Sequence, residues 1–249
     1  MIYFMGDIHG KFDKVIDTVQ RDRPQAIVLL GDMECEQPLH IILAPIRNLT
    51  EIWWIPGNHD VDRPELWANL VESELADRNL HGRVQQIDGV KVAGLGGVFR
   101  QEVWLPPHPP NFASHPDYEK ARLPPRRSRA EQGEGGKRVK HQSSIFPDVY
   151  AGLRRQRAEI LVTHEAPSCH PHGFGAIDEL AKAMRVTKMF HGHQHDCLDY
   201  SAWSRQQGIQ AFGVGMRGIT TVDGVVVVPG ERDDVRRRLR QQQAGKPPE

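Results

Sequence analysis

The chain has 249 residues, with 32 Lys or Arg against 32 Asp or Glu, so its formal net charge is zero. This length suffices for one large domain, or for one domain with an insertion. The neutral charge balance does not indicate a polyanionic partner, so any basic surface would have to be local. The three cysteines, Cys35, Cys169 and Cys197, follow no paired spacing, which favours a reducing compartment over a disulfide framework.

No apolar run approaches the length of a membrane span. The first residues also lack the basic start and apolar core of a signal peptide, since Asp7 interrupts them early. We therefore expect a cytoplasmic protein that does not enter a membrane.

The first third of the chain alternates short apolar strands with amphipathic helices. Strands are expected at 2–5, 27–30 and 52–55. Helices are expected at 11–20, at 39–46 with an end or bend at Pro45, and from Pro64 to about Leu75. This alternation with short links predicts a parallel, layered α/β half.

Two Asp-Gly pairs indicate hairpins in the remainder. Asp88-Gly89 separates apolar runs at 84–87 and 90–93, and Asp223-Gly224 separates runs at 218–222 and 225–228. Between them we expect strands at 160–162, 186–190 and 208–213 and a helix at 177–184. Periodicity alone gives an α/β class with a mostly parallel half.

The segment 104–144 differs from its surroundings in being rich in Pro, Arg, Lys and Gly. Within 117–141 there are eight Lys or Arg against four Asp or Glu, a local excess that can attract anions. We interpret 104–144 as a basic insertion, over the site or in a loop, within a single domain at 1–230. A charged tail follows at 231–249.

Five predicted strands end in residues that can bind metals. These residues are Asp7 and His9, then Asp32, then Asn58, His59 and Asp60, then His164, and finally His193 and His195. Each motif alone has a plainer explanation as a turn or a surface group, but their recurrence at five strand ends favours one assembled site. Imidazole with oxygen ligands suits Mn, Fe, Zn or Co, and the lack of cysteine ligands argues against a closed structural zinc site.

The order of these motifs makes the chain resemble the calcineurin-like metallophosphoesterases. The motifs are Asp-x-His, Gly-Asp, Gly-Asn-His-Asp, a lone His and Gly-His-x-His. The resemblance runs from Met1 to about Gly230, apart from the insertion. It implies a four-layer α/β/β/α sandwich, in which two mixed β-sheets are flanked by helices.

The resemblance also implies two divalent metal ions. Mn is the metal we expect, and Fe, Zn, Co or Ni are the alternatives. Asp7, His9 and His195 would hold one ion, Asn58, His164 and His193 the other, and Asp32 would bridge them. A hydroxide between the ions would attack phosphorus in line with the leaving group. His59 would assist the leaving group, and Asp60 would orient the His59 imidazole.

The loop after Asp32 departs from the phosphoprotein phosphatases and the diadenosine tetraphosphate hydrolases. It reads Met33-Glu34-Cys35-Glu36 where those branches carry an Arg-Gly turn. The phosphate-binding arginine of that turn is missing, unless Arg63, Arg100 or Arg217 replaces it. We therefore expect a divergent bacterial-type phosphoesterase.

Its expected substrate is a small-molecule or nucleotide phosphoester, cleaved as a phosphatase or a phosphodiesterase. A nuclease that binds nucleic acid through the basic insertion is the alternative. A non-catalytic scaffold on the same fold is disfavoured, because the full ligand set is present.

Overall fold

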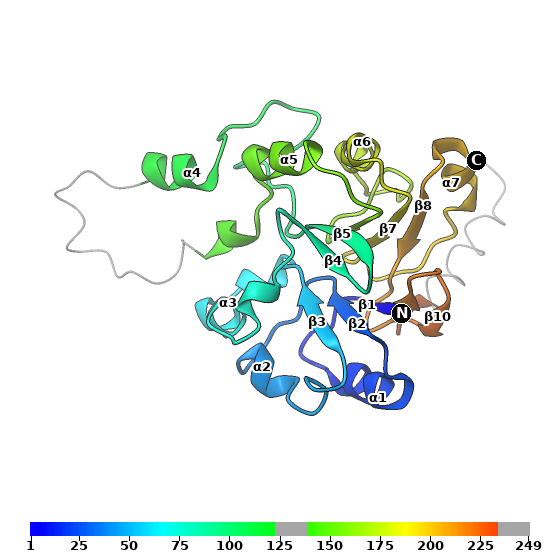
Figure 1. The fold of residues 1–249 in the computed structure, drawn as a ribbon. Coiled ribbons are helices and arrows are strands. Elements are labelled where there is room, and N and C mark those ends of the chain that lie inside the picture. The colour runs from blue at the N-terminus through cyan, green and yellow to red at the C-terminus, as the bar shows by residue number, and fades with distance from the viewer. Residues whose placement is uncertain (123–138, 234–249) are drawn as a thin grey trace, which may run out of the picture.

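Two five-stranded mixed sheets form the centre of the molecule in the computed structural model, which describes residues 1–122 and 139–233 (Figure 1). The first sheet has the order β10-β9-β1-β2-β3. Its strands are β1 (Ile2–Met5), β2 (Ala26–Leu29), β3 (Glu51–Trp54), β9 (Ile219–Thr221) and β10 (Val226–Val228). The second sheet has the order β4-β5-β6-β7-β8. Its strands are β4 (Arg83–Ile87), β5 (Val90–Leu95), β6 (Ile160–Thr163), β7 (Lys188–His191) and β8 (Gln210–Gly213).

Each sheet combines a parallel part with an antiparallel edge. Strands β1, β2 and β3 are parallel, as the strand–helix alternation predicted, and β5 to β8 are parallel as well. The hairpin around Asp88 and Gly89 adds β4 to the second sheet, and both turn residues have the positive φ that such turns require. The last hairpin returns to the first sheet, where β9 runs antiparallel to β1.

Helices cover the outer face of each sheet (Figure 1). Beside the first sheet lie α1 (Asp13–Asp22), α2 (Leu39–Ile42) and α3 (Pro64–Val71), with the 3₁₀ helices η1 (His59–Val61) and η2 (Ala76–Arg78). Beside the second lie α5 (Pro147–Arg154), α6 (Gly175–Met184) and α7 (Ser201–Gln207), with α4 (His115–Arg122) and η3 (Lys140–Ser143) further out. The four-layer α/β/β/α sandwich is thus confirmed.

The period of two along the strands decides which side chains fill which layer. In β1, Ile2 and Phe4 point between the sheets, whereas Tyr3 and Met5 pack under the helices of the first sheet. Phe4 stacks on Phe190 of β7 with ring centroids 3.7 Å apart. Aromatic contact between the inner faces therefore sets how the two sheets meet.

Four helices differ from the sequence-based expectation, since α2 is shorter than expected and α4, α5 and α7 were not expected. Helix α2 ends at Ile42, and the chain continues as turns through Pro45, which cannot donate a helical hydrogen bond. Helix α7 was not anticipated, because Ser201–Gln207 carries too few apolar residues to show a helical period.

The described ends of segment 104–144 pack against each other and against the residues that flank the segment. The Tyr118 ring in α4 lies 4.3 Å from the His141 ring, centroid to centroid, and Tyr118 shares an apolar cluster with Val103 and Phe146. Residues 123–138, with most of the positive charge, lie outside the described residues, as do 234–249. The proposed division into a domain, an insertion and a tail stays a prediction.

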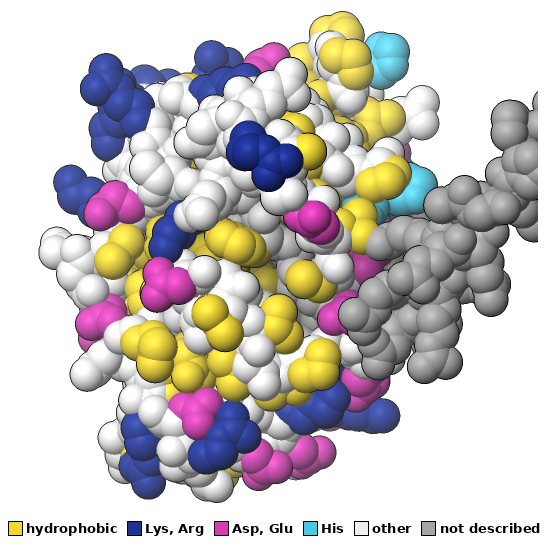
Figure 2. All heavy atoms as spheres, turned by 90° about the vertical axis from the view of Figure 1, so that its right-hand side faces the viewer, with side chains coloured by type: hydrophobic (Ala, Val, Ile, Leu, Met, Phe, Trp, Pro, Cys, Tyr) yellow, Lys and Arg dark blue, Asp and Glu magenta, His cyan; other side chains and the backbone are white. Residues whose placement is uncertain are grey.

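The face that carries the β10 edge displays apolar side chains (Figure 2). Val225 and Val226 are 61% and 45% exposed. An exposed apolar edge can pair with other chains, and the three-residue length of β10 limits the number of backbone groups available for such pairing.

Replacing Phe190 with Ala should lower the free energy of unfolding by about 3–5 kcal/mol, because the change leaves a cavity between the sheets. Urea denaturation followed by circular dichroism measures this loss. Val225→Ala, at an exposed position, is the matched control and should change stability by less than about 0.5 kcal/mol. Equal losses for both variants would contradict the assigned core.

Candidate metal centre

The residues expected at the site gather where the carboxyl ends of the two sheets meet. The first sheet supplies Asp7, His9, Asp32, Asn58 and His59 from the loops after β1, β2 and β3. The second sheet supplies His164 after β6 and both His193 and His195 after β7. Parallel strands deliver their following loops to the same edge, so the face-to-face packing brings these eight side chains together.

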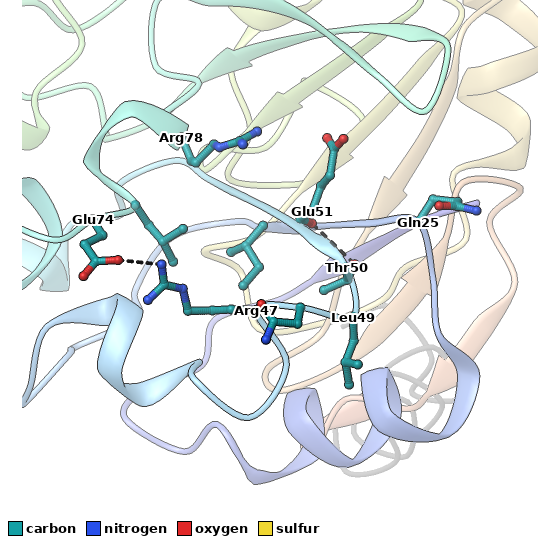
Figure 3. Close-up of a pocket in the computed structure, with 10 residues that line it drawn as sticks. Gln25, Arg47, Leu49, Thr50, Glu51, Glu74 and Arg78 are labelled. Atoms are coloured by element: carbon teal, nitrogen blue, oxygen red, sulfur yellow. Dashed lines mark hydrogen bonds and ion pairs between the residues drawn. The ribbon is translucent and has the colours of Figure 1, made fainter.

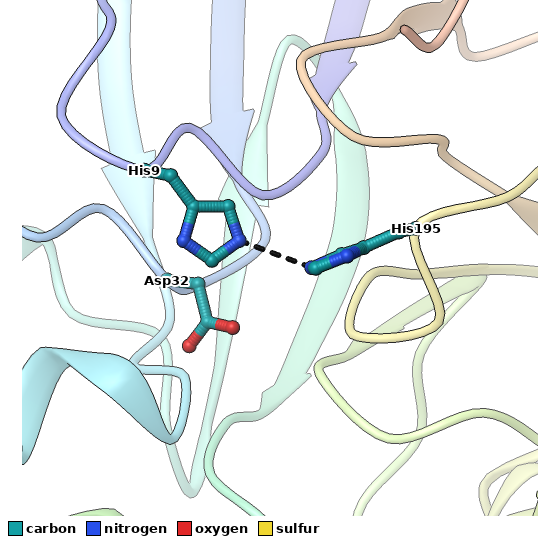
Figure 4. Close-up of side chains that lie close together, drawn as sticks. All are labelled: His9, Asp32 and His195. Carbon is teal, nitrogen blue, oxygen red and sulfur yellow. Dashed lines mark hydrogen bonds between the residues drawn. The ribbon is translucent and has the colours of Figure 1, made fainter. Parts of the chain in front are cut away.

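One group of converging ligand atoms consists of His9, Asp32 and His195, whose ligand atoms lie within 4.8 Å of one another (Figure 4). The Nε2 atoms of His9 and His195 are 3.0 Å apart. His9 Nδ1 lies 2.6 Å from Glu34 Oε1. A carboxylate on the far nitrogen fixes the tautomer of an imidazole and directs its other nitrogen toward a metal.

The second group consists of Asp32, His164 and His193, also within 4.8 Å. His164 Nδ1 donates to the Leu30 carbonyl at 2.7 Å, so its Nε2 faces the site. That nitrogen lies 3.4 Å from Asp32 Oδ2 and 3.1 Å from Asn58 Oδ1. Since Asp32 belongs to both groups, the geometry suits the bridging role that the family resemblance implied.

Asp7 reaches the site without joining either group. Its Oδ1 accepts the backbone N–H of His193 at 2.9 Å and lies 3.7 Å from His164 Nδ1. Asp7 Oδ2 and Asp32 Oδ2 are both buried. Within residues 1–122 and 139–233, neither oxygen accepts a hydrogen bond. Buried carboxylate oxygens without a donor are costly, and a divalent cation would satisfy both.

The electrostatics of the site favour added positive charge. Burial, followed by the like charge of Asp32, raises the pKa of Asp7 to about 7. Burial opposes protonation of His164, yet the carboxylates of Asp32 and Asp7 raise its pKa to about 10. The negative charge that stabilises a proton on this buried imidazole would also stabilise a metal cation bound in place of the proton. The donor set and its charge therefore fit divalent metal ions.

His193 is suited to metal ligation, because burial lowers its pKa to about 3 and keeps the imidazole neutral. Only the neutral ring offers a nitrogen lone pair to a metal.

The ligand loops adopt backbone conformations that were not predicted from the sequence. His9, Asp32, His193 and His195 all have positive φ, between 46° and 65°. Such angles are uncommon for residues other than glycine and concentrate at functional sites. A Cβ on Gly57 would lie 2.2 Å from Asp32 Oδ1, so the third motif requires glycine there.

His59 stands beside the first group without belonging to it. Its ring lies 5.6 Å from the His9 ring, centroid to centroid, and its side chain is 43% exposed. Its Nδ1 lies 2.6 Å from Asp62 Oδ2. Burial opposes protonation of His59, but its pKa is raised by Asp62 and by nearby carboxylates.

The expectation that Asp60 orients the His59 imidazole is wrong. Asp60 is fully buried, and its Oδ1 accepts the backbone N–H groups of Met33 and Glu34 at 2.7 and 2.9 Å. Its Oδ2 accepts the N–H of Gly57 at 2.8 Å. Asp60 therefore fastens the Asp32 loop to the Gly57 loop, and Asp62 holds the histidine.

Sequence reasoning also missed two carboxylates around the ligands. Glu34 contacts His9, and Glu165, directly after His164, accepts the Phe99 N–H at 3.2 Å and lies 3.8 Å from His193 Nε2. Both are close in sequence to a ligand, which is the signal that could have singled them out.

The larger of the two described pockets, about 460 Å³, lies elsewhere (Figure 3). Gln25 and Glu51 place it at the amino ends of β2 and β3, opposite the metal site. Its Arg47 and Glu74 already pair with each other at 2.6 Å. No predicted site residue lines it.

Comparisons with known proteins agree with this arrangement. Residues 1–197 match the model of the calcineurin-like phosphoesterases. The chain belongs to the calcineurin-like phosphoesterase family. An uncharacterized protein of Haemophilus influenzae is 35% identical over 224 residues, which cover 90% of this chain and 95% of that protein.

Solved structures share the fold. One crystal structure superposes with a TM-score of 0.57 at 12% identity, over 92% of this chain and 98% of the other. TT1561 of Thermus thermophilus superposes with a TM-score of 0.54 at 15% identity, over 92% and 97%. The family implies a hydrolase acting on phosphoester bonds and suggests dependence on divalent metals. Within the described residues, no helix has the length and hydrophobicity to span a membrane.

Asp32→Asn should remove most of the bound metal, because the neutral amide weakens both groups at once. Metal content after dialysis, measured by mass spectrometry, gives the result directly. Asp17→Asn, on the exposed side of α1, is the matched control and should retain metal. Full metal content in Asp32→Asn would contradict the shared-ligand assignment.

His59→Ala should retain metal and lose about 10²–10⁴-fold in turnover, the usual contribution of a general acid. Asp62→Asn should also retain metal and should show a smaller loss in turnover, because the imidazole stays in place without its partner's charge. Steady-state kinetics with parallel metal analysis separates these effects. If His59→Ala lost metal, His59 would be a ligand.

Proposed function

We propose that the protein is a metal-dependent phosphoester hydrolase that uses two divalent ions, Mn²⁺ being the first choice and Fe, Zn, Co or Ni the alternatives. The observation that carries the proposal is the sharing of Asp32 by two groups of ligand atoms. A carboxylate has two oxygens and can join two ions about 3.5–4 Å apart.

The ligand sets are proposed from the family and from these contacts. One ion would be held by Asp7, His9 and His195, the other by Asn58, His164 and His193, with Asp32 between them. When bound, two such ions clamp phosphoryl oxygens and make a water nucleophilic near neutral pH.

The side chains outside the ligand set complete the reaction. In hydrolysis, water gives up a proton as its oxygen bonds to phosphorus, the ester P–O bond breaks, and the leaving oxygen takes up a proton. His59 Nδ1 faces Asp62 at 2.6 Å, so Nε2 is the nitrogen that can deliver that proton. Because the His59 side chain is 43% exposed, a substrate in solution can reach it.

We propose a small-molecule or nucleotide phosphoester as the substrate. A nuclease is the second candidate, supported by the local excess of Lys and Arg in 117–141. Binding to DNA or RNA that weakens steeply with salt would favour it. A non-catalytic scaffold is not favoured, since the ligands and His59 are all present at one site.

The protein loaded with Mn²⁺ should hydrolyse an aryl phosphomonoester or an aryl phosphodiester, and chelation followed by dialysis should abolish the activity. Preference for the diester would point to nucleotide or nucleic-acid substrates, and preference for the monoester to a phosphatase. Metal bound at two sites without turnover of either substrate would contradict general phosphoesterase activity.

A further inference from the structure

Arg100 lies in the loop after β5, one residue from a backbone contact with a ligand loop. This loop reaches the site through two backbone contacts. Gly97 N–H donates to the Pro56 carbonyl at 2.6 Å, directly before the loop that carries Asn58 and His59. Phe99 N–H donates to Glu165, which follows His164. The loop that carries Arg100 is therefore fastened to ligand loops of both sheets, through Gly97 and Phe99.

Most N–H donors of the Arg100 guanidinium make no hydrogen bond within the described residues. The residue is half-buried, and its Nη2 donates to Ser143 Oγ at 3.3 Å. Its Nε is buried and has no hydrogen-bond partner within residues 1–122 and 139–233. A guanidinium carries five N–H donors in a planar fork, so most of its capacity is unused.

Its charge is also not paired directly. No carboxylate of the described residues lies within ion-pair distance of Arg100, and the neighbouring Glu102 pairs with Lys140 at 2.9 Å. Burial lowers the pKa of Arg100, while the charges of Glu102, Asp62, Glu165 and Asp32 act in the opposite sense. These carboxylates favour the charged guanidinium, and two of them belong to the site: Asp62, which contacts His59, and Asp32, which both ligand groups share.

The two other arginines considered from the sequence are engaged elsewhere. Arg63 is exposed and pairs with Glu36. Arg217 is buried and donates to the Ile8 carbonyl at 2.9 Å and to Glu231 at 2.6 Å, which fastens the loop after β1. Of these three, Arg100 alone combines unused donors with a loop that is fastened to ligand loops of both sheets.

We propose that Arg100 binds the non-bridging oxygens of the substrate's phosphoryl group. Two parallel N–H bonds from the planar fork match two oxygens of a phosphate, and a point charge cannot reproduce that pairing. This inference rests on the proposed function, because it concerns the substrate of the same site. Through Ser143, it also ties substrate binding to the end of segment 104–144.

The test combines phosphate binding with kinetics. Calorimetry with inorganic phosphate on the Mn²⁺-loaded protein should show affinity weakened about tenfold or more in Arg100→Gln, with Arg100→Lys intermediate. KM for the hydrolysed aryl ester should rise in the same order while metal content stays that of the wild type. Arg63→Gln removes an equal charge nearby and is the matched control, with unchanged binding.

Unchanged phosphate affinity and KM in Arg100→Gln would overturn the assignment of Arg100, even if the wild type is an active hydrolase. Failure of the proposed function has a different signature, because the wild-type protein would then hydrolyse neither aryl ester. Arg100→Lys guards against misfolding of the Gln variant. If only the Arg100→Lys variant folds, the comparison rests on that variant. A phosphate affinity equal to that of the wild type would then overturn the proposal.

Discussion

The carboxylate of Asp32 lies buried between two groups of histidines, and the rest of the site is arranged around it. Its Oδ1 accepts the His59 N–H at 2.8 Å, which fixes the side chain from the first sheet. Its Oδ2 faces His164 from the second sheet at 3.4 Å. A buried charge in this position requires compensating charge from both sides, so the two sheets must meet at their carboxyl ends.

The sandwich meets this requirement through its inner core. Phe4 and Phe190 stack between the sheets, and each lies on the strand that leads into a ligand loop. A shift of the sheets relative to each other would separate Asp7 from His193, which it meets at 2.9 Å. The apolar layer therefore sets the spacing of the polar site, because close-packed interiors resist such sliding.

The loops are held by contacts that carry no chemistry of their own. Asp60 ties the second and third motif loops together through three backbone N–H groups. Arg217 holds the loop after β1. These bonds support positive φ values at several ligands, which the isolated chain would disfavour. Rigid loops keep the ligand atoms close to the geometry that a cation needs.

The sequence by itself determined the ligand types and their places at the ends of strands. Apolar runs, glycine turns and polar residues that follow them are local features, and their order also indicated the family and its layers. Most strands were located for the same reason, whereas α7 gave too weak an apolar period to be recognised.

Only the tertiary structure decided which side chains meet. His9 and His195 are 186 residues apart and pair because two separate sheets converge. Asp62, and not the adjacent Asp60, orients His59, since η1 is a 3₁₀ helix in which residues three apart share a face. The loop after β5 meets the loop after β6 through the Phe99 N–H and Glu165, 66 residues apart in the sequence. Such contacts depend on tertiary packing and on the backbone dihedral angles of the loops. Neither can be predicted from the local sequence pattern.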